Sequence, residues 1–234
     1  MNIKRVNMTC PCCDTVFEDT IAVSWNTYGP TTTDFNTWSM PSDIHSCPSC
    51  GFSGGEVDFD VKDYYGHDCN EDDVKKTLPN SIKQRVRQEI SPHLKKNAEI
   101  PARRSYYYAA LIAQWRGAEW REIGHLYLGA AWCTRPYRGA MSKEEKRYRH
   151  KAINCFKKGL SERQIREKEV THYTYLIGEI YRRIGDEQEA SAWFGRVEKA
   201  ARGFRNRQWL VALAKQQKTD PQEFTTKEFC DEYG

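Results

Sequence analysis

The sequence has no long apolar run, and this absence excludes one class of protein. No stretch of about 18 consecutive apolar residues occurs in the 234 residues, so we expect no membrane-spanning helix. The first residues, Met1 to Arg5, lead into polar residues and cysteines, so we expect no secretory signal peptide. The nine cysteines are therefore expected in the reducing cytoplasm, where regularly spaced thiols are metal ligands more often than disulfides.

Motifs of common enzyme classes are also missing. The sequence contains no H-E-x-x-H, G-x-S-x-G, G-x-x-x-x-G-K-[ST] or G-x-G-x-x-G pattern. We therefore expect a protein that is not an enzyme. Aromatic residues, in contrast, are abundant, with 13 tyrosines and 7 tryptophans, and this content is typical of a folded chain rather than a disordered one.

Charge is distributed unevenly along the chain. Residues 1–80 contain 5 Lys and Arg against 13 Asp and Glu, whereas residues 81–234 contain 31 against 19. Such a change indicates two units with different surfaces. The acidic residues are concentrated in residues 56–73, which we interpret as a solvated connector. The alternative is a mimic of a polyanion that shields the basic half.

Two pairs of cysteines have the spacing of a metal site. Cys10 and Cys13 form one C-x-x-C pair, and Cys47 and Cys50 form the second after 33 intervening residues. Two thiolates on each of two tight turns can complete a tetrahedral set around one zinc ion, and four protein ligands leave no open position. We therefore predict one structural Zn²⁺. Short alternating runs between and after the pairs predict the small antiparallel sheet of a zinc ribbon.

Other candidate ligands lie near the two pairs. Cys12 competes with Cys13, but only Cys13 keeps the two-residue gap. His45, His67 and Cys69 are further candidates, although a single histidine near such a turn is more often a packing or surface residue. If Cys12 exchanges with a ligand thiolate on oxidation, the protein would be a zinc-dependent redox sensor.

From residue 79 onward the apolar residues recur with the period of helices. A leading helix is expected to end near Ser91 and Pro92, and short loops between the later helices predict antiparallel neighbours. The fold class is therefore mainly α, with a small N-terminal β zinc ribbon followed by an antiparallel α-helical array. The later helices are expected at about 102–116, 119–134, 142–160, 168–184, 186–202 and 206–217, with a last one from Asp220 to the C-terminus. The expected domains are a zinc ribbon over 1–61, an acidic connector with leading helices over 62–101, and a helical domain over 102–234.

Small and aromatic residues in the helical part have the spacing of a tetratricopeptide repeat. Gly178, Tyr181, Ala190 and Phe194 follow one another at separations of 3, 9 and 4 positions, and the preceding helix pair repeats this pattern in part. The alternative is an ordinary helical bundle in which the spacing reflects core packing.

In a repeat of this kind, the first helix of each pair lines a groove that binds a protein partner. The candidate partner-binding residues in this groove are Tyr127, Arg135, His172, Tyr175, Glu179 and Arg182. Tyr175 and Glu179 differ from the Lys and Asn of repeats that bind a C-terminal carboxylate, so that ligand is not expected. We therefore expect an adaptor or regulatory protein. The alternative is a nucleic-acid-binding protein that uses the basic helical half together with the zinc ribbon.

Several segments resemble a known family. The segments concerned are Thr33-Asp34-Phe35, 47–51, 112–117, 126–133 and 175–186. They resemble an uncharacterised bacterial family, a domain of unknown function, that combines an N-terminal two-knuckle CPxC zinc ribbon with C-terminal tetratricopeptide-like helices. The resemblance implies cytoplasmic, zinc-containing proteins without an established activity. It supports the expected architecture and leaves the partner, the process and the oligomeric state open.

Overall fold

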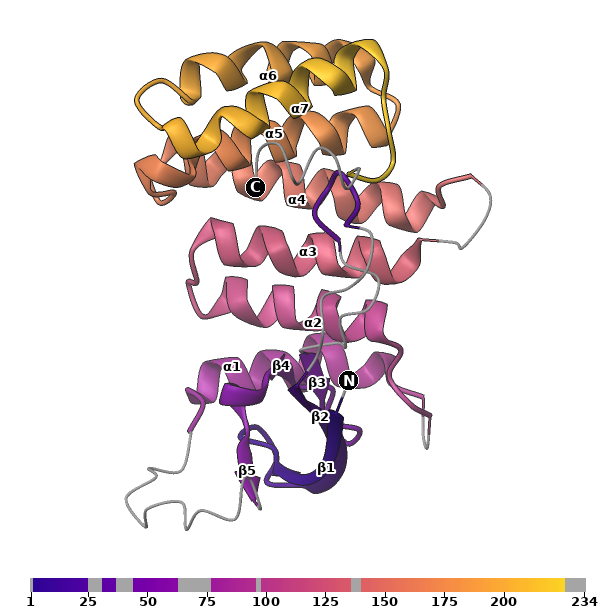
Figure 1. Cartoon of the computed structure of the whole chain (residues 1–234). Helices are drawn as coiled ribbons and strands as arrows, with labels where there is room; N and C mark the ends of the chain where they lie inside the picture. Colours follow the sequence, from indigo (N-terminus) through magenta and orange to yellow (C-terminus); the bar gives the residue numbers. More distant parts are fainter. Residues whose placement is uncertain are drawn as a thin grey trace. The chain divides into compact units, whose positions relative to one another are not determined.

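The fold is described from a computed structural model of the chain (Figure 1). The structure describes residues 2–24, 31–36, 44–62, 77–95, 98–135 and 140–225. Contacts divide the chain into two compact units. Unit 1 contains Met1–Asn26 and Met40–Ala118, and unit 2 contains Thr27–Ser39 and Glu119–Gly234. The two units are defined by contacts between residues, whereas the domains expected from the sequence, 1–61, 62–101 and 102–234, are defined by composition and motifs. The boundaries therefore differ.

Unit 1 contains two small antiparallel sheets. The first has the strand order β2-β1-β5, and the second is the hairpin β3-β4. The strands are β1 (Asn2–Thr9), β2 (Val16–Ser24), β3 (Ile44–Ser46), β4 (Ser53–Gly55) and β5 (Asp60–Lys62). The alternating apolar run over residues 57–61, after the second cysteine pair, predicts a strand that is only partly present, because Glu56–Asp58 forms a 3₁₀ turn. The backbone N–H of Gly55 donates to the Asp58 carboxylate at 3.0 Å, which favours a turn over an extended strand.

Two helical segments complete unit 1. Helix α1 (Asn80–Arg85) continues through a π-helical turn (Val86–Ile90) into a 3₁₀ turn (Ser91–His93), and α2 (Ala102–Trp115) begins after Pro101. The α- and π-helical part ends at Ile90, directly before Ser91 and Pro92 as expected, since proline cannot donate a hydrogen bond to a continuing helix. Helix α2 packs against β3 and β4. The apolar core of the unit includes Val6, Met8, Phe52, Phe59, Ile90 and Ile112.

Unit 2 contains five α-helices among its described residues. They are α3 (Trp120–Thr134), α4 (Lys143–Ser161), α5 (Glu167–Arg183), α6 (Glu187–Ala200) and α7 (Gln208–Thr219). Consecutive helices pack in antiparallel pairs, α3 with α4 and α5 with α6, so the expected mainly helical array is confirmed (Figure 1). Ser142 and Asp186 cap α4 and α6, as their sequence positions predict. None of the described helices combines the length and the apolar character needed to cross a membrane.

The expected helix from Asp220 is not present in the described residues 220–225. Phe224 instead forms an antiparallel bridge with Thr32. The N–H of Thr33 donates to the carbonyl oxygen of Glu223 at 3.0 Å, and the N–H of Thr225 donates to that of Thr31 at 3.0 Å. These bonds use backbone groups that a helix would need for itself, so the prediction is wrong here. Residues 226–234 lie outside the described part of the chain.

Two glycines allow close helix packing in unit 2. A Cβ atom added to Gly178 would lie 2.8 Å from Cδ1 of Phe194, and one added to Gly124 would lie 2.4 Å from Cε1 of Phe156. Real Cβ atoms do not approach other heavy atoms so closely, so each aromatic ring fills the space that a side chain would need.

We expect Gly178→Ala to lower the free energy of unfolding by about 1–3 kcal/mol, because the added methyl group overpacks the contact with Phe194. Gly195→Ala is the matched control. This glycine lies in α6 with no heavy atom within 4 Å of the added Cβ, so alanine should be neutral or stabilise the helix by up to about 1 kcal/mol. Denaturant unfolding followed by circular dichroism compares the two variants. Equal destabilisation by both would contradict the close contact.

Candidate functional site

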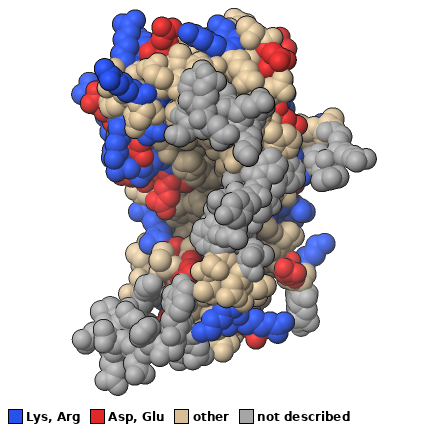
Figure 2. All heavy atoms as spheres, viewed as in Figure 1, with Lys and Arg blue, Asp and Glu red and all other residues tan. Residues whose placement is uncertain are grey.

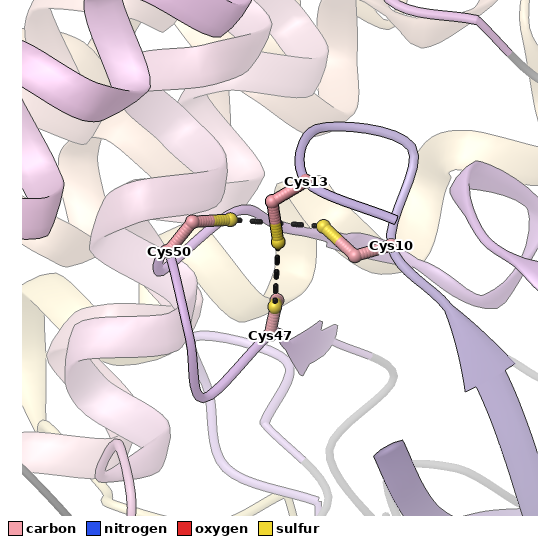
Figure 3. Close-up of side chains that lie close together, drawn as sticks. All are labelled: Cys10, Cys13, Cys47 and Cys50. Atoms are coloured by element: carbon pink, nitrogen blue, oxygen red, sulfur yellow. Dashed lines mark hydrogen bonds between the residues drawn. The ribbon is translucent and has the colours of Figure 1, made fainter. Parts of the chain in front are cut away.

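The four predicted metal ligands converge in unit 1 (Figure 3). The sulfur atoms of Cys10, Cys13, Cys47 and Cys50 all lie within 4.8 Å of one another. The Sγ–Sγ distance is 3.6 Å between Cys10 and Cys50 and 3.6 Å between Cys13 and Cys47. A tetrahedral ion with metal–sulfur bonds of about 2.3 Å separates its ligands by about 3.8 Å. The donor set therefore fits one metal ion.

The second cysteine pair lies on a tight turn that requires glycine. The N–H of Gly51 donates to the carbonyl oxygen of Cys47 at 2.9 Å, and the N–H of Cys47 donates to that of Phe52 at 2.8 Å. Gly51 has φ +78°, and a Cβ atom there would lie 2.6 Å from Cγ2 of Ile90. Both the backbone conformation and the packing thus exclude a larger residue at this position. The turn fixes the direction of both thiols.

The buried sulfur atoms need a positive charge if all are to ionise. Hydrogen bonding with Cys10 lowers the pKa of the Cys47 thiol, whereas hydrogen bonding with Cys10 raises the pKa of the Cys50 thiol. Without an ion these thiols share protons, and a divalent cation replaces the protons. Backbone N–H groups add partial positive charge. The N–H of Cys12 lies 3.4 Å from Sγ of Cys10, and that of Phe52 lies 3.5 Å from Sγ of Cys50.

The other candidate ligands do not join this group. Cys12 is buried next to it, but the four converging sulfur atoms include Cys13 and not Cys12. Nδ1 of His45 lies 3.0 Å from a carboxylate oxygen of Asp19, so the ring is held by this contact instead. His67 and Cys69 lie outside the described residues.

Four of the six predicted partner-binding residues, Arg135, His172, Tyr175 and Glu179, contact another segment of the chain itself. We call Thr31–Asn36 the inner segment. The hydroxyl of Tyr175 donates to the carbonyl oxygen of Thr33 at 3.0 Å, and the Thr33 hydroxyl donates to Glu179 at 2.6 Å. Tyr175 and Glu179 are each 0% exposed. A partner can therefore contact neither side chain while the inner segment is in place.

The other predicted partner-binding residues differ in accessibility. The ring of His172 stacks on Phe35 with centroids 4.7 Å apart. Tyr127 is buried, and the Lys151 ammonium group lies 5.0 Å from the centre of its ring. Arg182 binds Glu179 but keeps 22% of its side chain exposed, which makes it accessible to a partner.

Asp34 of the inner segment lies in a buried ion-pair network that includes the predicted residue Arg135. One carboxylate oxygen accepts hydrogen bonds from Nη2 of Arg135 at 2.8 Å, Nη1 of Arg149 at 2.9 Å and Nε1 of Trp132 at 3.1 Å. The other oxygen accepts from the Thr32 hydroxyl at 2.6 Å. We call Asp34 with its arginine partners Arg135, Arg149 and Arg183 the Asp34 clamp.

Electrostatics keep the Asp34 carboxylate ionised. Burial alone would raise the pKa of Asp34, but the three guanidinium groups of the clamp outweigh burial and hold that pKa well below its ordinary value. Two further carboxylates, Glu145 and Glu179, pair with the same arginines. The network thus balances three buried or nearly buried cations with three buried anions.

The sequence carries little sign of most of the clamp. Arg149 lies in the charged run 143–151, which a helix usually exposes to water, yet its side chain is 0% exposed. The spacing of Glu145 and Arg149, four positions apart on one helix, is the local signal for their ion pair. Asp34 was marked only by its place in a segment that carries the family resemblance.

The purified chain should contain one divalent metal ion, and Cys47→Ser should lose most of it, because a serine hydroxyl is a much poorer ligand than a thiolate. Cys12→Ser is the matched control, since it removes a neighbouring thiol that is not one of the four, and it should keep the ion. Element analysis per chain measures both. Full metal content in Cys47→Ser would contradict the four-cysteine site.

Asp34→Asn should lower the free energy of unfolding at pH 7 by about 3–5 kcal/mol, because the three arginines of the clamp would keep Glu145 and Glu179 but lose the buried carboxylate that they share. Asp220→Asn, at an exposed position at the end of α7, should change it by less than about 0.5 kcal/mol. The folded pKa of Asp34 is lowered, so its contribution is complete above the unfolded pKa of about 3.9 and is lost as the pH falls toward the folded value.

Unfolding curves measured from pH 7 to pH 2 test this pH dependence. The difference between wild type and Asp34→Asn should shrink below about pH 4. A difference that stays constant over the whole range would show that the variant acts through something other than the charge of Asp34.

A comparison with protein-family models places the chain in a known group. Residues 3–220 match the family described as "Uncharacterized protein conserved in bacteria (DUF2225)". Neither the curated proteins nor the solved structures include a match to the chain. Because the match covers most of the sequence, including all four converging cysteines and the Asp34 clamp, the chain belongs to the DUF2225 family of uncharacterised bacterial proteins.

Proposed function

We propose that the chain is a non-enzymatic zinc-binding adaptor, in which unit 1 holds one structural Zn²⁺ and unit 2 binds a protein partner through its tetratricopeptide-like helices. The observation that supports this function is the binding of the inner segment by unit 2. The helices hold a short turn of the chain through its backbone, through one carboxylate and through one aromatic ring. Helical arrays that bind peptides use the same three kinds of contact.

Zinc is the metal that the donor set favours. Four thiolates in a tetrahedral arrangement suit Zn²⁺ or an iron–sulfur centre, and two C-x-x-C turns on a small ribbon are typical of zinc. Four protein ligands leave no position for a metal-bound water, so the ion would have a structural role. Thiols stay reduced and available to the metal in the cytoplasm, which is the compartment we propose.

Nucleic-acid binding is the second candidate function. Lysine and arginine side chains gather on the visible face of unit 2 over α6 and α7 (Figure 2). Two tryptophan faces are already covered by cations: Lys158 lies 4.3 Å from the ring centre of Trp120, and Arg196 lies 4.6 Å from that of Trp193. Bases would have to displace these cations to stack, so the protein adaptor is the better supported function. Binding to oligonucleotides that weakens steeply with salt would reverse this order.

The adaptor function can be tested at Arg182, which lies at the edge of the covered surface. A photo-crosslinking residue at position 182 of the full chain identifies a partner in bacterial extract, and the same residue at the exposed position 199 on α6 serves as the control. The identified partner is then purified and titrated. Arg182→Ala should weaken its binding about tenfold, and Lys199→Ala should leave it unchanged. If the partner binds the Arg182→Ala and Lys199→Ala variants with equal affinity, the surface around Arg182 is not the binding site.

A further inference from the structure

We propose that the inner segment occupies a binding site for an acidic peptide that forms a tight turn, and that the partner binds by displacing it with a segment of the same kind. The inner segment is such a turn, since the N–H of Phe35 donates to the carbonyl oxygen of Thr32 at 2.8 Å. This inference rests on the proposed function and adds two things to it. It names the chemistry of the partner, a threonine-rich segment with an acidic residue followed by an aromatic one. It also makes access to the site depend on competition with the chain's own residues.

The backbone of the inner segment is held in the way that a bound peptide is held. On one side, the Tyr175 hydroxyl donates to the carbonyl oxygen of Thr33 at 3.0 Å. On the other side, the N–H of Thr33 donates to Glu223, and the carbonyl oxygen of Thr31 accepts from Thr225, both at 3.0 Å. Every peptide backbone offers such groups, so a peptide of another protein that forms the same turn can make the same bonds.

The charge of the site requires a carboxylate from its occupant. Without Asp34, the three arginines of the clamp would face two buried carboxylates, those of Glu145 and Glu179. The further carboxylate, of Glu223, is 55% exposed and lies 3.4 Å from Arg183 and 3.9 Å from Arg135, so it does not reach the fully buried Arg149. A buried cation without a counter-ion is strongly destabilising. The site therefore selects an occupant with one acidic side chain. The Thr32 hydroxyl binds the second oxygen of Asp34, which adds a preference for threonine or serine two positions before the acid.

An aromatic residue after the acid completes the recognition. The ring of Phe35 lies among three rings of α5 and α7, with centroid distances of 4.7 Å to His172, 5.5 Å to Tyr175 and 6.0 Å to Trp209. Phe35 has φ +65°, a backbone conformation that costs a non-glycine residue about 1 kcal/mol or more. The contacts of this ring with the three rings around it thus offset the backbone cost, so the site favours an aromatic residue directly after the acid.

The experiment uses the full chain and two capped synthetic peptides, Thr-Thr-Thr-Asp-Phe-Asn and the matched control Thr-Thr-Thr-Asn-Phe-Asn. The Thr33→Ala/Phe35→Ala variant weakens the inner segment, because it removes the hydrogen bond to Glu179 and the ring contacts. The acidic peptide should bind this variant at least about tenfold more tightly than wild type, since it no longer competes with an intact inner segment. The control peptide should bind about tenfold more weakly than the acidic one.

A further substitution tests the arginines of the clamp. Arg135→Lys in the Thr33→Ala/Phe35→Ala chain should weaken binding of the acidic peptide by a similar factor.

The other possible results of this experiment also support or contradict the proposal. If the double variant does not fold, the acidic peptide should restore its thermal unfolding transition and the control peptide should not; the milder Phe35→Ala variant then gives the affinities. A folded, metal-loaded variant that binds neither peptide, or both equally, would overturn the proposal. If the peptides fail while a partner still binds through Arg182, only this inference is lost. If Arg182→Ala also leaves partner binding unchanged, the adaptor function is lost as well.

Discussion

A carboxylate buried among three guanidinium groups determines which parts of unit 2 must meet. Asp34 comes from the stretch between the two cysteine pairs, Arg135 follows α3, and Arg149 and Arg183 lie on α4 and α5. Each of these charges would be costly to bury alone, so each needs the others in place. The buried charges therefore couple two features of unit 2. The helices α3, α4 and α5 can pack in this way only when the inner segment is in place. A helical array held only by apolar contacts would not need an inserted segment in this way.

Local features of the fold could be predicted from the sequence. The helices of unit 2 were identified by the recurrence of apolar residues and by capping residues such as Ser142 and Asp186, all of which act within a few positions. The metal ligands were identified for a related reason. Each C-x-x-C pair lies on one turn, so the spacing alone places two sulfur atoms side by side. Only the meeting of the two turns involves distant parts of the chain.

The features that the sequence did not reveal depend on long-range pairing. Nothing in the neighbourhood of Asp34 points to Arg149, which lies 115 positions away. Arg149 itself belongs to a run of charged residues, 143–151, whose composition is that of an exposed helix face. Residues 223–225 were expected to be helical, but their backbone groups pair with the inner segment. Periodicity placed Tyr175 and Glu179 on the inner face of α5, and it contains no information about what covers that face.

The path of the chain gives the metal centre an effect beyond unit 1. The inner segment lies between Cys13 and Cys47, so an ion bound to both pairs closes a loop whose middle part is docked in unit 2. A closed, short tether keeps a segment at a high local concentration near its site, and this concentration falls as the tether lengthens. Loss of the ion would open this loop of 33 residues and widen the range of positions that the inner segment can take, so its local concentration near the site would fall. The four cysteines would then set how strongly the chain competes for its own binding site, although none of them belongs to unit 2.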